Sequence, residues 1–266
     1  MKEYKHEKTA AIILAGGSGS RMLEEIRPRN RDSSSFLRRA GSLIRKQYMN
    51  LLGKPMLAYT LEAFEKSRVD EIYLVISKGD RDFVHSKIVD RYGYRKVAGY
   101  ATGGAERYHS VYQGLLAIDR DQKKAGRANR GHDVKYVLIH DGARPLITPD
   151  LVNRCISQVK KDKACLMAMP AKDTIRLVDG EGMSEDTPPR DRIWIVQTPQ
   201  CFVFREILDA FTKMMEAGDG TVTDDGMVME RYGTRPVHLF EGSYENIKVT
   251  TPDDFIMAEA ILMRRI

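Results

Sequence analysis

Short apolar runs alternate with stretches of helical spacing along most of this chain of 266 residues. Compact, mainly apolar segments predict strands, and these lie at 10–15, 71–77, 95–98, 135–140 and 164–169. Apolar residues three or four positions apart predict helices between the strands, at 55–66, 80–90, 105–118 and 149–161. Strands that alternate with helices predict an α/β fold, Rossmann-like, in which a mostly parallel sheet carries helices on both faces.

The last part of the chain follows the alternation less regularly. It predicts helices at 205–216, at 224–232 and from Pro252 onward, and strands at 235–240 and 246–249. The chain length favours one domain, 1–266, with elaborations. Two segments interrupt the pattern and are expected to be those elaborations.

The first elaboration, residues 23–45, is rich in Arg and Ser. A stretch of this length without periodicity is uncommon in a compact domain unless it is functional, so we expect an inserted mobile loop. The second, residues 170–197, carries Pro and Gly at intervals that suit turns. We expect this segment to be a protruding β-arm.

The composition, 42% hydrophobic, is that of a globular protein. The sequence has no run near the roughly 20 apolar residues of a membrane helix, and its first eight residues lack the apolar core of a signal peptide. Three cysteines without a C-x-x-C pair suit a reducing compartment and a place in or near the core: Cys155, Cys165 and Cys201. We therefore expect a cytoplasmic protein with no membrane contact, and no second enzyme fused behind Ile266.

The net charge of +6 comes from 43 Lys and Arg residues against 37 Asp and Glu residues. It is concentrated in residues 1–60, which hold twelve basic and five acidic residues, so the rest of the chain is close to neutral. A nucleic-acid-binding protein would more often spread a basic face along its fold. Positive charge beside one Gly-rich loop favours a small polyanion, such as a nucleoside triphosphate.

The sharpest motif follows the first predicted strand and reads Leu14-Ala-Gly-Gly-Ser-Gly-Ser-Arg-Met22. Glycines let the backbone turn tightly and approach phosphates without a Cβ clash. The dinucleotide fingerprint G-x-G-x-x-G is not met, because Met22 stands where its third glycine would fall. The remaining Gly-x-Gly-x-Arg pattern resembles that of nucleotidyltransferases, and Arg21 suits bidentate phosphate contact.

A second motif places Asp141 at the end of a predicted buried strand, within Ile139-His-Asp-Gly-Ala-Arg-Pro145. Ligands bind at the carboxyl ends of strands in open α/β sheets, and an Asp there can hold a Mg²⁺ ion that bridges phosphates. Arg144 suits either a carboxylate or a substrate. Lys248 lies in an apolar-flanked segment, where a cation needs an anionic partner such as a phosphate.

Eight stretches, taken in order, carry a family resemblance: AGGSGSRM (15–22), KQY (46–48), GGAERYHSV (103–111), HDGARP (140–145), KDT (172–174), QTPQ (197–200), TDD (223–225) and NIKVT (246–250). With them the chain resembles the 2-C-methyl-D-erythritol 4-phosphate cytidylyltransferases of the non-mevalonate isoprenoid pathway, from about residue 10 to residue 263. The resemblance implies that the phosphate of methylerythritol phosphate attacks the α-phosphorus of CTP in line. The products would be CDP-methylerythritol and pyrophosphate.

The resemblance also implies roles for individual residues. The nucleotide-binding set would be Ala15, Gly16, Gly17, Ser18, Gly19, Gly104 and Ser110. The catalytic cations on the phosphates would be Arg21, Lys46 and Lys248, and Asp141 would serve Mg²⁺. Methylerythritol phosphate would be held by Arg144, Thr174, Arg190, Thr198 and Thr223. In that family the arm reaches across a homodimer, so Thr174 and Arg190 would serve the neighbouring subunit's site.

The chain departs from the family pattern at three places. The family usually has Ala where this chain has Gly16, and often Asp where it has Ala105. It joins its signature Arg and Lys by a short link, usually with Pro before the Lys, whereas 24 residues separate Arg21 from Lys46 here and Arg45 replaces the Pro. We expect the inserted segment to be a flexible flap over the triphosphate.

Three other functions remain open at this point. A ribitol 5-phosphate cytidylyltransferase is slightly favoured by the Ala-Gly-Gly start, and disfavoured by the ERYHSVY (106–112) and HDGARP (140–145) stretches. A nucleotide-binding regulatory module without turnover is disfavoured by the full set of charged groups. Nucleic-acid binding by the Arg-rich insert would require a salt-dependent shift of DNA or RNA.

Overall fold

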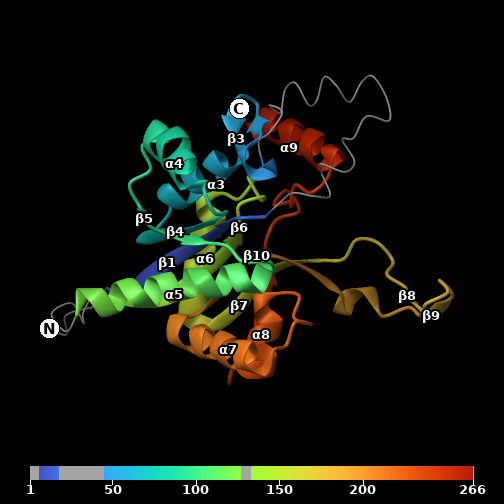
Figure 1. Cartoon of the computed structure of the whole chain (residues 1–266). Coiled ribbons are helices and arrows are strands. Elements are labelled where there is room, and N and C mark those ends of the chain that lie inside the picture. Colours follow the sequence, from blue (N-terminus) through green and yellow to red (C-terminus); the bar gives the residue numbers. More distant parts are fainter. Residues whose placement is uncertain (1–5, 18–44, 127–132, 266) are drawn as a thin grey trace, which may run out of the picture.

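The computed structural model describes residues 6–17, 45–126 and 133–265. Seven strands of this part form one sheet, in the order β11-β7-β10-β6-β1-β4-β5 (Figure 1). The strands are β1 (Lys8–Ala15), β4 (Glu71–Ile76), β5 (Val97–Thr102), β6 (Val134–Asp141), β7 (Ala164–Pro170), β10 (Trp194–Val203) and β11 (His238–Glu241).

The sheet is mixed but mostly parallel, as predicted. β1 pairs in parallel with β4 and with β6, and β5 continues parallel to β4. These four neighbouring strands therefore end at the same edge of the sheet. β10 runs antiparallel to β6 and to β7, so it begins at the edge where the others end.

Both faces of the sheet are covered. Alternate side chains of a strand point to opposite faces, and in β1 Ala11 and Ile13 join one buried cluster while Ala10 and Ile12 join the other. The first face packs against α3 (Met56–Glu65), α4 (Arg81–Val84), η2 (His85–Asp90) and α6 (Pro149–Asp162). The second packs against α5 (Arg107–Ala125), α7 (Phe204–Ala217) and α8 (Asp225–Tyr232). The predicted layer arrangement is confirmed.

Strand β10 was not predicted, although it lies near the middle of the sheet. Proline cannot donate to a strand ladder and argues against a central strand, and Pro199 lies inside β10. The structure accommodates it at an irregularity, where the register with β7 shifts between Val196 and Gln200. The segment 197–199 leaves the ladder there. The Gln197 side chain then donates to the carbonyl of Ser243, and the Thr198 hydroxyl accepts from the amide of Asp141.

Two predicted strands differ from the structure. The strand expected at 95–98 is β5, which runs further, from Val97 to Thr102. The predicted strand stops before Gly99 because glycine weakens a strand pattern. In the structure this glycine leaves room for the Tyr73 ring, since a Cβ at Gly99 would lie 2.7 Å from Cε1 of Tyr73. The strand expected at 246–249 is absent. That segment makes individual hydrogen bonds in place of a strand ladder; for example, the amide of Val249 donates to the carbonyl of Ala143 at 2.8 Å.

Two predicted helices also differ in their course. The helix expected at 80–90 is divided into α4 and the π-helical η2. The helix expected at 105–118 continues as α5 to Ala125. Its last turns are polar, and Lys123 pairs with Asp119 one turn earlier at 2.7 Å, an interaction that supports a helix without an apolar pattern.

The protruding arm is present. β8 (Leu177–Val178) and β9 (Ser184–Asp186) pair as an antiparallel hairpin, and Figure 1 shows it extended away from the body of the molecule. The predicted arm ends too late, because residues 194–197 belong to β10. Of the inserted segment 23–45, all but residue 45 lies outside the described residues.

A third buried cluster covers the edge at which the parallel strands end. It joins α9 (Pro252–Arg265) to residues that follow η1 (Lys46–Tyr48), with Met49, Leu51 and Phe255 among its members. The three cysteines are buried, as predicted. Among the described residues, no helix combines the length and the apolar character that crossing a bilayer requires.

Helix α5 lies so close to the sheet that a methyl group would not fit at Gly114. A Cβ there would lie 2.7 Å from Cγ2 of Ile12 and 3.0 Å from Cγ2 of Val75. At an open helix position Gly→Ala stabilises by about 0.5–1 kcal/mol. Here we expect Gly114→Ala to lower the free energy of unfolding by about 1–3 kcal/mol, through overpacking. Urea denaturation measures this.

Gly180→Ala, where a Cβ would meet nothing within 4 Å, is the control and should leave the unfolding free energy within about 0.5 kcal/mol of wild type. A Gly114→Ala variant more stable than wild type would contradict the close packing of α5.

Candidate functional site

A cleft of about 380 Å³ opens where β1 and β6 end and α5 begins. Five segments far apart in the sequence form it. Its lining residues are Leu14, Ala15, Gly16, Gly17, Arg45, Lys46, Gln47, Gly104, Ala105, Glu106, Arg107, Ser110, Asp141, Ala143, Lys248 and Thr250. The cleft lies at the carboxyl ends of parallel strands, where α/β sheets bind their ligands.

The start of the Gly-rich turn forms one wall. A Cβ at Gly16 would lie 3.3 Å from the carbonyl carbon of Ile76, so the backbone runs close to the end of β4. Ser77 Oγ donates to the carbonyl of Gly16 at 2.8 Å, and Gln47 Nε2 donates to the carbonyl of Ala15 at 2.5 Å. The predicted Ala15, Gly16 and Gly17 therefore line the cleft, whereas Ser18, Gly19 and Arg21 lie outside the described residues.

Gly104 and Ser110, which are expected to lie beside the nucleoside, also line the cleft. The amide of Gly104 donates to Ser110 Oγ at 3.1 Å. A Cβ at Gly104 would lie 2.4 Å from Cβ of His109, so glycine is required for this approach of the loop to α5. Gly104 and Ser110 thus form one unit at the beginning of the helix.

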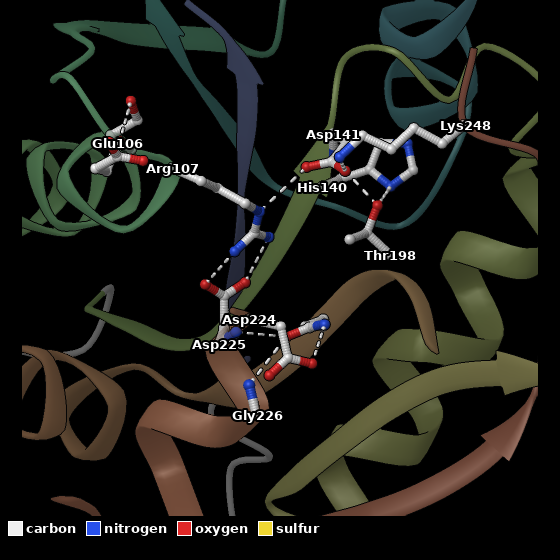
Figure 2. Close-up of polar contacts among 11 residues, drawn as sticks. Glu106, Arg107, His140, Asp141, Thr198, Asp224, Asp225, Gly226 and Lys248 are labelled. Carbon is white, nitrogen blue, oxygen red and sulfur yellow. Dashed lines mark hydrogen bonds and ion pairs between the residues drawn. The ribbon is translucent and has the colours of Figure 1, made fainter. Parts of the chain in front are cut away.

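The Asp141 carboxylate is buried at the end of β6 between two cations (Figure 2). Lys248 Nζ lies 2.8 Å from Oδ2, and Arg107 Nε lies 3.4 Å from Oδ1. Burial alone would raise the pKa of Asp141, but the charges of Arg107, Lys248 and Arg144 outweigh it and hold that pKa well below its usual range. The carboxylate is therefore ionised at neutral pH.

Arg107 had no predicted role, yet it connects two buried carboxylates. Its Nη1 and Nη2 donate to the two oxygens of Asp225 at 2.7 and 2.8 Å, and Figure 2 shows the guanidinium between Asp225 and Asp141. Asp225 begins α8, where Gln200 Oε1 accepts from the amides of Asp225 at 2.9 Å and Gly226 at 3.0 Å. These contacts fix the guanidinium from the side away from the cleft.

Behind Asp141, His140 and Thr198 hold the end of β6. Thr198 Oγ1 accepts from the amide of Asp141 at 3.1 Å and lies 3.0 Å from Nδ1 of His140. The carbonyl of Arg144, 3.4 Å from His140 Nε2, can only accept. Nε2 therefore carries the hydrogen, and the Thr198 hydroxyl donates to Nδ1. Burial lowers the pKa of His140 to about 3, so the imidazole is neutral.

Arg144 lies behind the cleft lining. Its Nη1 donates to the carbonyl of Asn246 at 2.7 Å, and Asn246 Nδ2 donates to the carbonyl of Thr198 at 2.9 Å. Its Nε is buried and has no hydrogen-bond partner. The visible contacts of Arg144 hold the segment that presents Lys248.

The other predicted substrate residues lie apart from the cleft lining. Thr174 and Arg190 are exposed on the arm, where Arg190 Nη1 donates to the carbonyl of Lys172 at 3.2 Å. Thr223 is exposed just before α8. Thr198 is buried behind Asp141, as described above. Lys46 lies in η1 and lines the cleft.

The cleft can bind a polyanion. Lys46, Arg107 and Lys248 supply positive charge to its lining, and the glycine turn brings backbone close to the ligand. Within the described residues, no three His, Cys, Asp or Glu side chains gather into a metal cage. Asp141 is one hard oxygen donor, and one carboxylate together with substrate phosphates is a usual way to bind Mg²⁺. The donor set fits an ion that arrives with phosphates.

Comparison with known proteins gives one family. A family model described as IspD, 2-C-methyl-D-erythritol 4-phosphate cytidylyltransferase, matches residues 34–264. A protein of that name from Lachnoclostridium phytofermentans is 39% identical over 256 residues, which are 96% of this chain and 97% of the relative. Another from Alkaliphilus oremlandii is 40% identical over 97% of this chain and 96% of its own length.

Solved structures agree with this result. The crystal structure of 4-diphosphocytidyl-2C-methyl-D-erythritol synthase from Anaerococcus prevotii is similar with a TM-score of 0.75 and 30% identity, over 97% of this chain and 99% of the other. The Francisella tularensis structure of 2-C-methyl-D-erythritol 4-phosphate cytidylyltransferase has a TM-score of 0.69 at 28% identity, over 96% of this chain and 99% of its own.

Removal of the Arg107 side chain should leave Asp225, whose side chain is 1% exposed, as a buried carboxylate without its main partner. We expect Arg107→Met to lower the free energy of unfolding by about 3 kcal/mol. The double variant Arg107→Met/Asp225→Asn should regain most of this loss, because a neutral amide needs no counter-ion. Denaturant titrations of the four proteins of the cycle measure the coupling; strictly additive effects would contradict a buried ion pair.

Proposed function

This chain belongs to the 2-C-methyl-D-erythritol 4-phosphate cytidylyltransferase family, and on that premise we propose how its cleft carries out the family's reaction. The enzyme transfers the cytidylyl group of CTP to 2-C-methyl-D-erythritol 4-phosphate, giving CDP-methylerythritol and pyrophosphate. The observation that carries the proposal is the meeting of the glycine turn, Asp141 and Lys248 in one cleft. Family relatives named for methylerythritol phosphate disfavour ribitol phosphate as the substrate.

The reaction needs alignment and charge stabilisation rather than a covalent enzyme intermediate. A phosphate monoester dianion is already a nucleophile, so its oxygen attacks the α-phosphorus of CTP in line and pyrophosphate leaves on the opposite side. Holding the two anions together against their repulsion is the main task of the protein. Cations aimed at the developing negative charge perform it.

Residues of the cleft divide this task. Gly16 and Gly17 would wrap the triphosphate, while Gly104 and Ser110 would lie beside the nucleoside; all four line the same cleft. Lys46 and Lys248, with Arg21, would neutralise the phosphates, and loss of one such group elsewhere costs about 2.7–4 kcal/mol of transition-state stabilisation. Thr198 and Arg144 hold Asp141 and the Lys248 segment in place.

Asp141 would hold a Mg²⁺ ion together with oxygens of the triphosphate. The bound ion would supply further positive charge to the phosphate oxygens. Asp141 is suited to this because its carboxylate lines the cleft and its pKa is low for the reasons given above. Its contact with Lys248 would bring a second positive group to the same phosphates.

The arm is proposed to complete the site of a second copy in a homodimer. Its exposed Leu177, Val178 and Met183 are 51%, 57% and 67% accessible, and such apolar exposure on an extended hairpin favours a protein contact. Thr174 and Arg190 lie on this arm away from the cleft of their own chain, so they would reach methylerythritol phosphate in the partner. The three buried free thiols suit a cytoplasmic location.

A product assay tests the function. Purified protein with CTP and Mg²⁺ should release pyrophosphate when methylerythritol 4-phosphate is added, and much more slowly with ribitol 5-phosphate. Mass spectrometry should identify CDP-methylerythritol as the product. Faster turnover of ribitol 5-phosphate would show that this compound, and not methylerythritol phosphate, is the substrate. Nucleotide binding without pyrophosphate release would indicate a regulatory module.

Subunit mixing tests the arm. Arg190→Ala and Lys248→Ala should each lose most activity, Lys248→Ala by about 10²–10³-fold. In a heterodimer of the two variants, one site would carry both changes and the other neither. We expect the heterodimer, isolated through two different affinity tags, to regain about half of wild-type turnover. An inactive heterodimer would show that both residues serve the site of their own chain.

A further inference from the structure

Arg45 lines the cleft immediately before Lys46. The proposed reaction assigns no role to the Arg45 side chain. Its backbone precedes η1, and its side chain is 37% exposed. It is thus a further cation at the mouth of the cleft, on the same short segment as an expected phosphate ligand.

The Arg45 side chain is held in a ring of contacts with Asp80 and Tyr48. Its Nε lies 2.9 Å from Oδ2 of Asp80. The Tyr48 hydroxyl donates to the same Oδ2 at 3.0 Å, and the amide of Tyr48 donates back to the carbonyl of Arg45 at 2.8 Å. Burial and then the Asp80 carboxylate raise the pKa of Tyr48, so its hydroxyl remains a donor.

The segment that carries Arg45 is also attached to the glycine turn. Gln47 Nε2 donates to the carbonyls of Ala15 and Gly17, at 2.5 and 3.3 Å. Tyr48 is 5% exposed, and its ring lies 5.4 Å from that of Phe83. Backbone and guanidinium of Arg45 are therefore held in fixed relation to the proposed triphosphate wall.

A guanidinium carries five N–H donors in one plane. The contact with Asp80 occupies Nε, and the four N–H groups of the two Nη atoms are the ones whose fork matches phosphate oxygens. Asp80 does not line the cleft, whereas Arg45 does. The carboxylate therefore holds the guanidinium from one side, in the way that a supporting contact preorganises a binding group.

We propose that Arg45 is an additional phosphate-binding residue of this enzyme, oriented by Asp80 and Tyr48 toward the triphosphate of CTP. This inference rests on the proposed function, because it assumes that the triphosphate occupies the cleft. An ion pair with Asp80 alone would give little reason for the arrangement, since ion pairs between partly exposed side chains contribute little to stability.

The test is direct binding of two ligands by titration calorimetry: CTP with Mg²⁺, and cytidine, which has no phosphate. Arg45→Met should raise the Kd of CTP about tenfold, which corresponds to ~1.4 kcal/mol, and leave the Kd of cytidine unchanged. Arg45→Lys should lie between Arg45→Met and wild type, because it keeps the charge but loses the fork.

Arg81→Met is the matched control, because it removes the same charge from a neighbouring side chain that does not line the cleft and lies over the Tyr100 ring. It should leave both dissociation constants within about twofold of wild type. Asp80→Asn should weaken CTP binding less than Arg45→Met does, since the cation remains but its support is reduced.

Unchanged CTP binding by Arg45→Met would overturn the inference, and so would equal weakening of CTP and cytidine. An effect of Arg81→Met as large as that of Arg45→Met would also overturn it, because it would mean general electrostatics rather than contact. Turnover by the wild-type enzyme distinguishes failure of the proposed function from failure of the Arg45 inference. If wild type converts CTP and methylerythritol phosphate while Arg45→Met binds CTP normally, only this inference fails.

Discussion

The buried carboxylate of Asp141 is the interaction on which the arrangement of the site depends. A charge at the end of a central strand must be neutralised, and this need draws three distant segments together. Lys248 approaches Asp141 from the segment before α9, and Arg107 approaches it from the first turn of α5. Arg107 also pairs with the buried carboxylate of Asp225 and so connects α8 to the same site. The same carboxylate that the fold must neutralise lines the cleft, so electrostatic stability and the proposed binding of Mg²⁺ would share one residue.

The antiparallel strand β10 explains how polar side chains gather behind that carboxylate. Its irregular stretch leaves Thr198 free of the ladder to accept from the amide of Asp141. Gln200, where the ladder resumes, binds the start of α8 with its side chain. Because β10 begins at the edge where β6 ends, the arm that precedes it leaves the molecule beside the cleft. One reversed strand thus positions both the inner support of the site and the segment proposed to reach a partner.

The sequence predicted those parts of the site that depend on local pattern. An apolar run that stops at glycines marks the turn at Gly16 and Gly17, and Asp141 is the residue at which a buried strand ends. Lys248 was recognised because a lysine among apolar neighbours needs an anion, and its partner proved to include Asp141 at 2.8 Å. These signals lie within a few residues of the side chain they identify.

The missed features depend on contacts between distant segments. Arg107 and Asp225 are 118 residues apart, and no local pattern links them. One signal was present: a cation in the first turn of a helix opposes the helix dipole and therefore needs nearby negative charge. Strand β10 was missed because Pro199 is unfavourable in a ladder, and only the tertiary structure supplies the irregularity that accepts it.

A crystal structure of the protein with CTP and Mg²⁺ tests the central claim most directly, namely that turn, carboxylate and cations act on one triphosphate. The account predicts phosphate oxygens within hydrogen-bond distance of the Gly16–Gly17 backbone and of Lys248 Nζ, with Asp141 in the same metal–phosphate cluster. A triphosphate bound elsewhere, with Lys248 still paired only to Asp141, would contradict it.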